Sequence, residues 1–251
     1  MVVLQNVPNL FLIQKNIMKK KYSLILPCYN EYKNLRLLIP LIFKCFSKSK
    51  YQIIIVDDNS EDLTIKKLKS KFGSNKNIKY ILRKKNPSLG LSIKEGIKKS
   101  DGNVIIVMDT DFNHSPKDLK KMINLYDLND YDLICGSRFL KGGFSTTYFR
   151  HYCSKIFNLF VNFITRGKIS DNMSGFFIIK KSFLNNMLDK IFYGYGDFYI
   201  RLLFYMQKKN LRIRETPVRY APRKFGQSKT KFVKILFLYS FEATKLIFKN
   251  K

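Results

Sequence analysis

The sequence predicts an α/β protein with a mostly parallel central sheet flanked by helices, and two observations support this prediction. Short apolar segments in the first half of the chain alternate with segments whose apolar residues follow a helical period. The apolar segments contain few alternating polar residues, which is typical of parallel strands that are covered on both faces. Repeated strand and helix units of this kind favour a Rossmann-like arrangement.

The elements of the first half can be placed in order along the chain. The expected strands cover residues 22–27, 51–57, 78–82 and 103–108. The expected helices cover residues 34–46, a segment after the second strand, and residues 91–99. We expect Asn30 to cap the first helix and Ser60 to cap the second, with Glu61 and Asp62 in the first turn of the second helix.

The second half is less regular. Strands are expected within residues 131–139, 173–181 and 211–220, and a Gly- and Pro-marked loop covers residues 221–229. Apolar residues at helical spacing predict a helix over residues 149–164. We divide the chain into an N-terminal extension (1–20), one large domain (21–230) and a C-terminal amphipathic helix (231–251).

The composition limits the classes of function. The formal net charge of +29 indicates an anionic partner, although a Lys-rich composition is also typical of an AT-biased genome. A nucleic-acid-binding protein would need a clustered basic patch, and here the charge is spread along the chain, so we expect no nucleic-acid partner. No apolar run reaches 18 residues, so we expect no membrane span. The four cysteines form no CxxC pair and predict reduced thiols.

Polar and acidic residues follow three of the expected strands, in the segments PCYNE, VDDNS and MDTD. In a parallel sheet these strand ends lie at one edge, where ligands bind. Asp109 and Asp111 are two residues apart, so in extended backbone their carboxylates point the same way and repel each other. Mg²⁺ or Mn²⁺ bound with a substrate phosphate would remove this repulsion. The alternative is a pair of solvated turn acids.

A set of motifs resembles one known family. The motifs are PCYNE, VDDNS, SLGLSIKEGIKKSDGNVIIVMDTD, GSRF, DNMSGFF and RKFGQSK. Their order and spacing resemble the inverting family-2 glycosyltransferases with the GT-A fold, and among them the dolichol-phosphate mannose synthases and bacterial polyprenyl-phosphate relatives. The resemblance covers residues 21–242 and implies a nucleotide-sugar donor.

The resemblance also implies roles for the matching residues of the donor site. The nucleoside would lie against Pro27, Tyr29, Glu31, Val56 and Asp58. Mg²⁺ or Mn²⁺ on the diphosphate would lie at Asp109, the Thr110 backbone, Asp111 and Asn113, the last of which replaces the usual Gln or Ser. The donor phosphates would contact Arg138, Arg223 and Lys229.

On the acceptor side, the resemblance implies that an acceptor phosphate faces Arg150, Ser154 and Asn158. The chain departs from the family pattern at Ser88, at Phe177 and at Asp197, which leaves the sugar and acceptor pockets less specified than the nucleotide pocket.

The expected reaction is metal-dependent inverting transfer of a hexose, with mannose from GDP-mannose favoured, to a polyprenyl or dolichyl monophosphate. Such a phosphate has a second pKa of about 6, so it needs positioning more than a general base. The alternatives are another donor such as UDP-glucose, a glycan acceptor, or an inactive homologue, against which the intact acids and arginines argue.

We also expect peripheral association with the cytoplasmic face of a membrane, either the endoplasmic reticulum or a bacterial inner membrane. The helices at 149–164 and 231–251 would lie in the membrane interface, or their apolar stripes would instead pack in the core. Some related enzymes rely on small membrane subunits, which are possible partners here.

Overall fold

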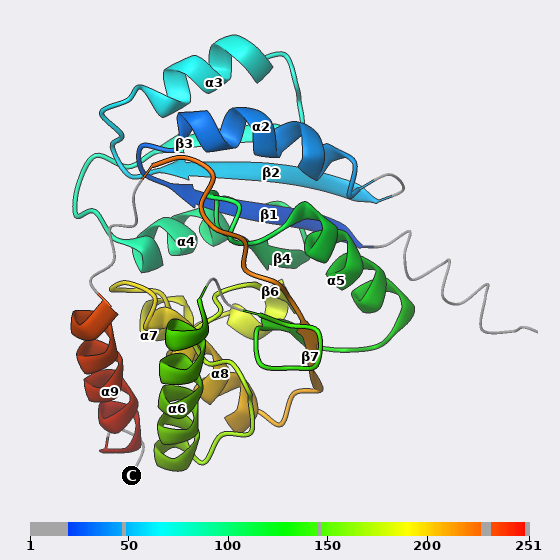
Figure 1. Cartoon of the computed structure of the whole chain (residues 1–251). Coiled ribbons are helices and arrows are strands. Elements are labelled where there is room, and N and C mark those ends of the chain that lie inside the picture. Colours follow the sequence, from blue (N-terminus) through cyan, green and yellow to red (C-terminus); the bar gives the residue numbers. More distant parts are fainter. Residues whose placement is uncertain (1–19, 47–48, 145–146, 227–231, 249–251) are drawn as a thin grey trace, which may run out of the picture.

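A computed structural model describes residues 20–46, 49–144, 147–226 and 232–248 (Figure 1). The described chain forms a seven-stranded sheet in the order β3-β2-β1-β4-β6-β5-β7. Only β6 runs antiparallel to its neighbours, β4 and β5. The strands are β1 (Lys21–Cys28), β2 (Lys50–Asp57), β3 (Ile78–Leu82), β4 (Val104–Val107), β5 (Leu133–Ser137), β6 (Phe177–Lys180) and β7 (Ile213–Pro217).

Helices cover both faces of the sheet, as the apolar strands predict. Successive residues of β1 point to opposite faces, so Leu24 and Leu26 pack in one core cluster and Ile25 in another. The first cluster lies beneath α2 (Tyr32–Phe43), α3 (Thr64–Phe72) and α5 (Pro116–Leu128). The second lies beneath α4 (Leu89–Lys98), α7 (Leu188–Ile191) and α8 (Phe198–Lys208). The predicted α/β class and the mostly parallel sheet are therefore confirmed.

Both predicted helix caps are wrong, because Asn30 and Ser60 join two loops to each other. The backbone of Asn30 is left-handed, with a φ of 59°, and its side chain accepts hydrogen bonds from the backbone of Glu61 and Asp62. The Asn30 amide in turn donates to the Ser60 hydroxyl, 2.7 Å away. Helix α2 therefore begins at Tyr32 and α3 only at Thr64. The cross-link fixes the loops after β1 and β2 side by side.

Helices α5 and α8 were not predicted. Helix α5 carries a start signal in the sequence, since the Ser115 hydroxyl accepts a hydrogen bond from the amide of Asp118 at 3.0 Å and Pro116 occupies the first helical position. Helix α8 is buried along most of its length, so its sequence lacks the polar face by which a surface helix is recognised. A short 3₁₀ turn (Lys181–Leu184) follows β6.

Helices α6 (Tyr148–Thr165) and α9 (Phe232–Phe248) form a pair beside the sheet (Figure 1). Their inner faces meet α8 in a third apolar cluster that contains Val161, Ile200 and Ala243. The two helices also expose large apolar side chains on their outer faces: Tyr148, Phe149, Tyr152, Ile156, Leu159, Phe160, Phe163, Phe237, Leu238, Phe241 and Phe248.

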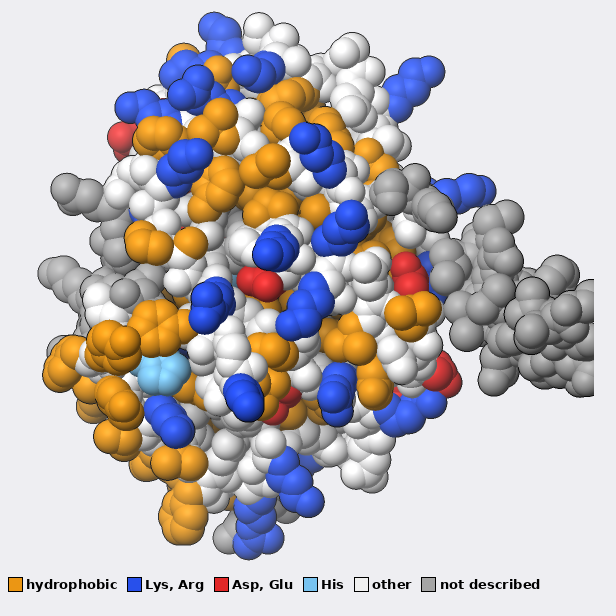
Figure 2. All heavy atoms as spheres, turned by 45° about the vertical axis from the view of Figure 1, so that its right-hand side comes forward, with side chains coloured by type: hydrophobic (Ala, Val, Ile, Leu, Met, Phe, Trp, Pro, Cys, Tyr) orange, Lys and Arg blue, Asp and Glu red, His pale blue; other side chains and the backbone are white. Residues whose placement is uncertain are grey.

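The predicted apolar stripe of α6 is thus divided between core and surface. Phe157 and Val161 are buried, whereas Phe163 is 85% exposed. Figure 2 shows hydrophobic side chains gathered at the lower left of one face, with Lys and Arg spread over the rest. Among the described residues, no helix combines the length and apolarity that a membrane crossing requires.

Candidate active site

A cleft of about 920 Å³ lies at the carboxyl ends of β1, β2 and β4. The opposite wall comes from distant parts of the chain, including residues 173–175, 195–198 and the start of α9. Most of the site residues predicted from the sequence line this one cleft: Pro27, Tyr29, Glu31, Asp58, Asp109, Thr110, Asp111, Asn113, Arg138, Ser154 and Arg223. The topology therefore brings together residues that are up to about two hundred positions apart in the sequence.

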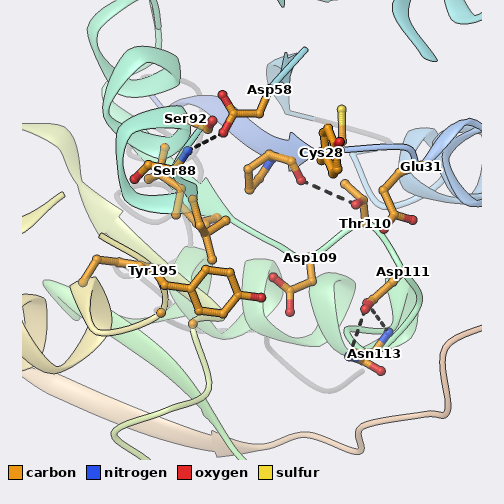
Figure 3. Close-up of a pocket in the computed structure, with 18 of the residues that line it drawn as sticks. Cys28, Glu31, Asp58, Ser88, Ser92, Asp109, Thr110, Asp111, Asn113 and Tyr195 are labelled. Atoms are coloured by element: carbon orange, nitrogen blue, oxygen red, sulfur yellow. Dashed lines mark hydrogen bonds between the residues drawn. The ribbon is translucent and has the colours of Figure 1, made fainter. Parts of the chain in front are cut away.

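Asp109 and Asp111 lie on a tight turn directly after β4. The carboxylate of Asp109 points into the cleft (Figure 3). The carboxylate of Asp111 is held by Asn113, whose amide donates to one oxygen at 3.0 Å and whose side chain donates to the other at 3.1 Å. Asn113 therefore orients Asp111 through its side-chain nitrogen. The intervening Thr110 hydroxyl donates to the carbonyl of Pro27 on β1, 3.5 Å away.

The carboxylates of Asp109 and Asp111 both have raised pKa values, chiefly because they are withdrawn from water. Burial in the cleft raises the pKa of Asp109 to about 6, with a further rise from Glu31 and opposing contributions from Arg223 and Arg138. Burial and the neighbouring Asp109 also raise the pKa of Asp111. Oxygen ligands on a short turn that repel each other fit a hard divalent cation such as Mg²⁺ or Mn²⁺.

Arg223 pairs with two neighbouring acids of the cleft. Its guanidinium lies 2.6 Å from the carboxylate of Glu31 at the end of β1 and 2.8 Å from that of Asp111. The second oxygen of Glu31 accepts from the side chain of Asn34, 2.6 Å away, and Asn34 also donates to the carbonyl of Phe225 at 3.2 Å. The segment around Arg223 is therefore docked on the start of α2 by a buried polar network. Lys229 lies outside the described residues.

Arg138 is fixed at the cleft wall by Asp171, the first residue of the DNMSGFF motif, for which no role was predicted. Its guanidinium makes two hydrogen bonds of 2.8 Å to the carboxylate of Asp171, which is fully buried, and its backbone amide makes a third of 3.0 Å. The guanidinium also lies over the ring of Tyr220, 4.7 Å from its centroid. A paired arginine in this geometry is rigid and stays charged, as the site of a phosphate requires.

Asp58, which was expected to contact the nucleoside, is held by two partners. One carboxylate oxygen lies 2.5 Å from the guanidinium of Arg83, and the other accepts from the amide of Ser88 at 2.6 Å. Arg83, which was not predicted, also donates to the hydroxyl of Ser92. Val56 is fully buried in the core under α4 and does not line the cleft as described. Its expected contact with the nucleoside therefore remains a prediction. Val56 lies within β2, two positions before Asp58.

The comparison with protein families matches the glycosyl transferase family 2 model over residues 23–188, which include the acid turn and Arg138. The chain belongs to glycosyl transferase family 2. It is 33% identical over 217 residues to a dolichol-phosphate mannosyltransferase of Pyrococcus furiosus, covering 84% of this chain and 59% of that protein. It is 27% identical over 249 residues to that of Saccharomyces cerevisiae, covering 92% of each.

Solved structures show the same fold at lower identity. A glucosyl-3-phosphoglycerate synthase of Mycobacterium tuberculosis, in complex with Mn²⁺, UDP and glucosyl-3-phosphoglycerate, aligns with a TM-score of 0.69 at 13% identity over 99% of this chain and 85% of its own. The same enzyme with Mg²⁺ and UDP aligns with a TM-score of 0.68 at 13% identity, over 98% of this chain and 84% of its own. These likenesses establish that this family 2 member has the GT-A type of fold.

Helix α6 carries three residues for which the resemblance implied contact with an acceptor, Arg150, Ser154 and Asn158. Ser154 of α6 is 4% exposed and lines the cleft. Asn158, one turn later, donates to the Ser154 carbonyl at 2.7 Å and accepts from the amide of Asn172 at 2.5 Å, so it joins α6 to the 171–175 segment. The side chain of Arg150 lies outside the described residues, although α6 passes through this position.

A buried ion-pair network, also not predicted, joins α9 to the cleft. Arg201 is fully buried, and its guanidinium lies 2.5 Å from Asp197 and 3.1 Å from Glu242 of α9. It also donates to the carbonyl of Tyr193 and lies over the ring of that residue. The network holds residues 193–197, where Tyr195 extends toward Asp109 (Figure 3).

The 193–197 segment also packs closely on the start of α4. The amide of Gly90 donates to the carbonyl of Gly194 at 3.0 Å, and the Ser88 hydroxyl donates to the same oxygen at 2.6 Å. A Cβ atom at Gly90 would lie only 2.5 Å from the Tyr193 carbonyl, so only glycine permits this approach. The two walls of the cleft are therefore in direct contact here.

Proposed function

We propose that the chain is a metal-dependent inverting hexosyltransferase that moves a sugar, with mannose from GDP-mannose favoured, to a polyprenyl or dolichyl monophosphate. The main support is the convergence of Asp109 and Asp111 with Arg138 and Arg223 in one cleft. This arrangement suits a diphosphate leaving group, whose developing charge needs cations held in place before the reaction. The named activity of the archaeal and yeast relatives favours mannose and a dolichyl phosphate.

Asp109 and Asp111 would hold Mg²⁺ or Mn²⁺, with Asn113 keeping Asp111 in orientation. The ion would supply positive charge to the diphosphate as it leaves. Arg223 now neutralises Glu31 and Asp111. When a donor enters, its phosphates would compete for Arg223, and Glu31 would become available to the nucleoside. Arg138, which keeps its pairing with Asp171, would provide a fixed positive charge.

A phosphate acceptor suits the acids available in the cleft better than a hydroxyl does. A hydroxyl would require a general base, and Asp197 is the candidate that the sequence offers. One oxygen of Asp197 pairs with Arg201, and the other accepts from the amide of Tyr195 at 2.7 Å. An acid with both oxygens engaged is a poor base. A phosphate dianion would instead be positioned by Ser154 and by Arg150.

We further propose that the outer faces of α6 and α9 lie in a membrane interface at the cytoplasmic face of the endoplasmic reticulum or of a bacterial inner membrane. Seven large apolar side chains of α6 are at least 41% exposed, and Ser154 of the same helix lines the cleft. An interfacial helix would thus present the lipid phosphate to the site, with basic residues facing anionic headgroups. Small membrane subunits are possible further partners.

The direct test is a screen of nucleotide sugars for stabilisation of the protein against heat, with and without Mn²⁺. We expect GDP-mannose with Mn²⁺ to give the largest rise in melting temperature, followed by transfer to a short-chain prenyl phosphate. If the melting temperature rises with UDP-glucose and not with GDP-mannose, UDP-glucose is the donor, and the proposed class of reaction is unchanged. Equal stabilisation by every donor with excess chelator would contradict the metal-dependent proposal.

A further inference from the structure

We propose that His114 is a positioning residue that fixes the backbone of Asp109 and ties the acid turn to the segment that carries Arg223. The inference rests on the proposed metal and nucleotide function of Asp109. The role comes from the hydrogen bonds of the imidazole, which is 1% exposed and lies behind the acid pair. His114 is not among the described residues that line the cleft, so it would act through Asp109 and Tyr220, which do line it.

The hydrogen bonds define which ring nitrogen of His114 carries the proton. The amide of Asp109 donates to Nδ1, which lies 2.9 Å away, so Nδ1 must be unprotonated. The proton is then on Nε2, which lies 2.6 Å from the hydroxyl of Tyr220 and 3.2 Å from the carbonyl of Ser174. Tyr220 donates its own proton to the same Ser174 carbonyl. One neutral tautomer therefore satisfies every group in the network.

Asp109 needs such support because the sheet does not provide it. The paired register of β4 with β1 ends at Val107, and the last backbone contact is from Met108 to Ile25, at 3.3 Å. The turn that follows includes Phe112 in a left-handed conformation, with a φ of 72°. The amide of Asp109 thus lies beyond the strand ladder, and the side chain of His114 accepts the hydrogen bond that a neighbouring strand would otherwise accept.

The other side of the network reaches the arginines. The ring of Tyr220 lies under the guanidinium of Arg138 and is three residues before Arg223. The imidazole is stacked on Phe176 with ring centroids 4.5 Å apart, so an apolar ring covers one face of it. His114 is therefore the point at which the acid turn, Arg138 and the Arg223 segment are held in register. Residues that orient ligands in this way typically contribute 10- to 100-fold to metal affinity.

Two substitutions separate the two nitrogens of the ring. In His114→Asn, the side-chain oxygen takes the place of Nδ1 and can still accept from the amide of Asp109. In His114→Gln, the amide group takes the place of Nε2 and can reach Tyr220 but not Asp109. Phe176→Leu is the matched control, because it removes the stacked ring and lowers stability without changing any hydrogen bond of His114.

The experiment measures Mn²⁺ affinity in the presence of GDP by calorimetry, together with hydrogen exchange of the Asp109 amide by NMR. We expect His114→Gln to lose about 10- to 100-fold in Mn²⁺ affinity and to lose protection of the Asp109 amide. In His114→Asn and Phe176→Leu, we expect the Mn²⁺ affinity and the protection of the Asp109 amide to stay within about threefold of the wild-type values.

The outcomes separate this inference from the proposed function. Wild-type Mn²⁺ affinity and amide protection in His114→Gln would overturn the positioning role of His114. Losses in all three variants in proportion to their melting temperatures would also overturn it, since they would show a general structural role. If the wild-type protein fails to bind Mn²⁺ with GDP, the proposed function fails, and the exchange of the Asp109 amide alone then decides whether His114 holds that backbone.

Discussion

The two walls of the cleft differ in how they are built. The donor wall, where we propose that the donor binds, consists of residues that follow β1, β2 and β4, and neighbouring loops fix them, as Asn30 and Ser60 do. The acceptor wall, where we propose that the acceptor binds, includes Ser154 of α6, the start of α9 and residues 173–175 and 195–198, and pairs of residues far apart in sequence fix it. Parallel strands place their carboxyl ends together as a consequence of topology, whereas helices need specific contacts to stay in register.

This difference predicts that substitutions in the donor wall act on chemistry, while those in the acceptor wall act on stability and on acceptor use. The largest effect is expected for Asp111→Asn, which removes one charge of the acid pair and keeps the side-chain shape. We expect the transfer rate to fall at least about 1000-fold, because stabilisation of the leaving diphosphate is lost. The melting temperature should stay close to that of the wild-type protein.

The control for this variant is Asp189→Asn, which removes an exposed acid that pairs with Lys94 on the surface. Its transfer rate should equal that of the wild-type protein. Wild-type turnover in Asp111→Asn, measured with saturating donor, would contradict the assignment of the acid pair to the metal and would remove the contrast between the two walls.

The next largest effect is expected at the acceptor wall and concerns stability. Arg201→Ala leaves the half-buried Asp197 and the buried Glu242 without their common cation. Loss of one partner from a buried ion pair typically costs about 3–5 kcal/mol in the free energy of unfolding. Urea denaturation measures this cost. Lys94→Ala, which breaks the exposed pair with Asp189, should have little effect on the free energy of unfolding. Equal losses in the two variants would show that the Arg201 network does not fix α9.

A smaller effect, on acceptor use alone, is expected for Arg150→Ala. A charge-assisted contact with a phosphate dianion is among the stronger polar interactions, so its loss should lower kcat/KM for prenyl phosphate by about 10- to 100-fold. Steady-state kinetics and calorimetry with GDP-mannose together separate acceptor from donor. The affinity for the donor should be unchanged, and a parallel loss of donor affinity would place Arg150 on the wrong wall.

The smallest effect is expected on the outer face of α6. Replacement of Phe149, Ile156 and Phe163 by Ser removes apolar area that is exposed to water. We expect binding to anionic phospholipid vesicles to fall at least about tenfold in sedimentation assays, with little change in stability. Leu128→Ser changes another exposed apolar residue, at the end of α5, and should not affect vesicle binding. Vesicle binding that survives the triple substitution would rule out α6 as the membrane-facing surface.

The sequence was most informative where a residue follows a strand. Asp109, Asp111, Glu31 and Asp58 could all be placed at one edge because each lies just after an apolar segment. The helix caps were wrong for a related reason, since Asn and Ser also bridge loops and only the fold shows which partner they meet. Val56 was expected both in a strand covered on both faces and against the nucleoside, and the structure confirms its burial.

The supporting residues could not be predicted, because their partners lie far away in the sequence. Asp171 reaches Arg138 across 33 positions, and Tyr220 reaches His114 across 106. No periodicity or spacing connects such pairs, and each residue alone looks like an ordinary polar side chain. His114 carried the one available signal, since it is one of only two histidines and lies three residues after Asp111.

The central claim is that this cleft transfers a sugar to a phosphate dianion. The most direct measurement compares a short prenyl phosphate, the corresponding prenyl alcohol and a free glycan as acceptors in one assay with GDP-mannose and Mn²⁺. We predict a product with the prenyl phosphate alone, because Asp197 is engaged with Arg201 and no base is needed for a dianion. Transfer to the alcohol or to the glycan, with none to the phosphate, would contradict it.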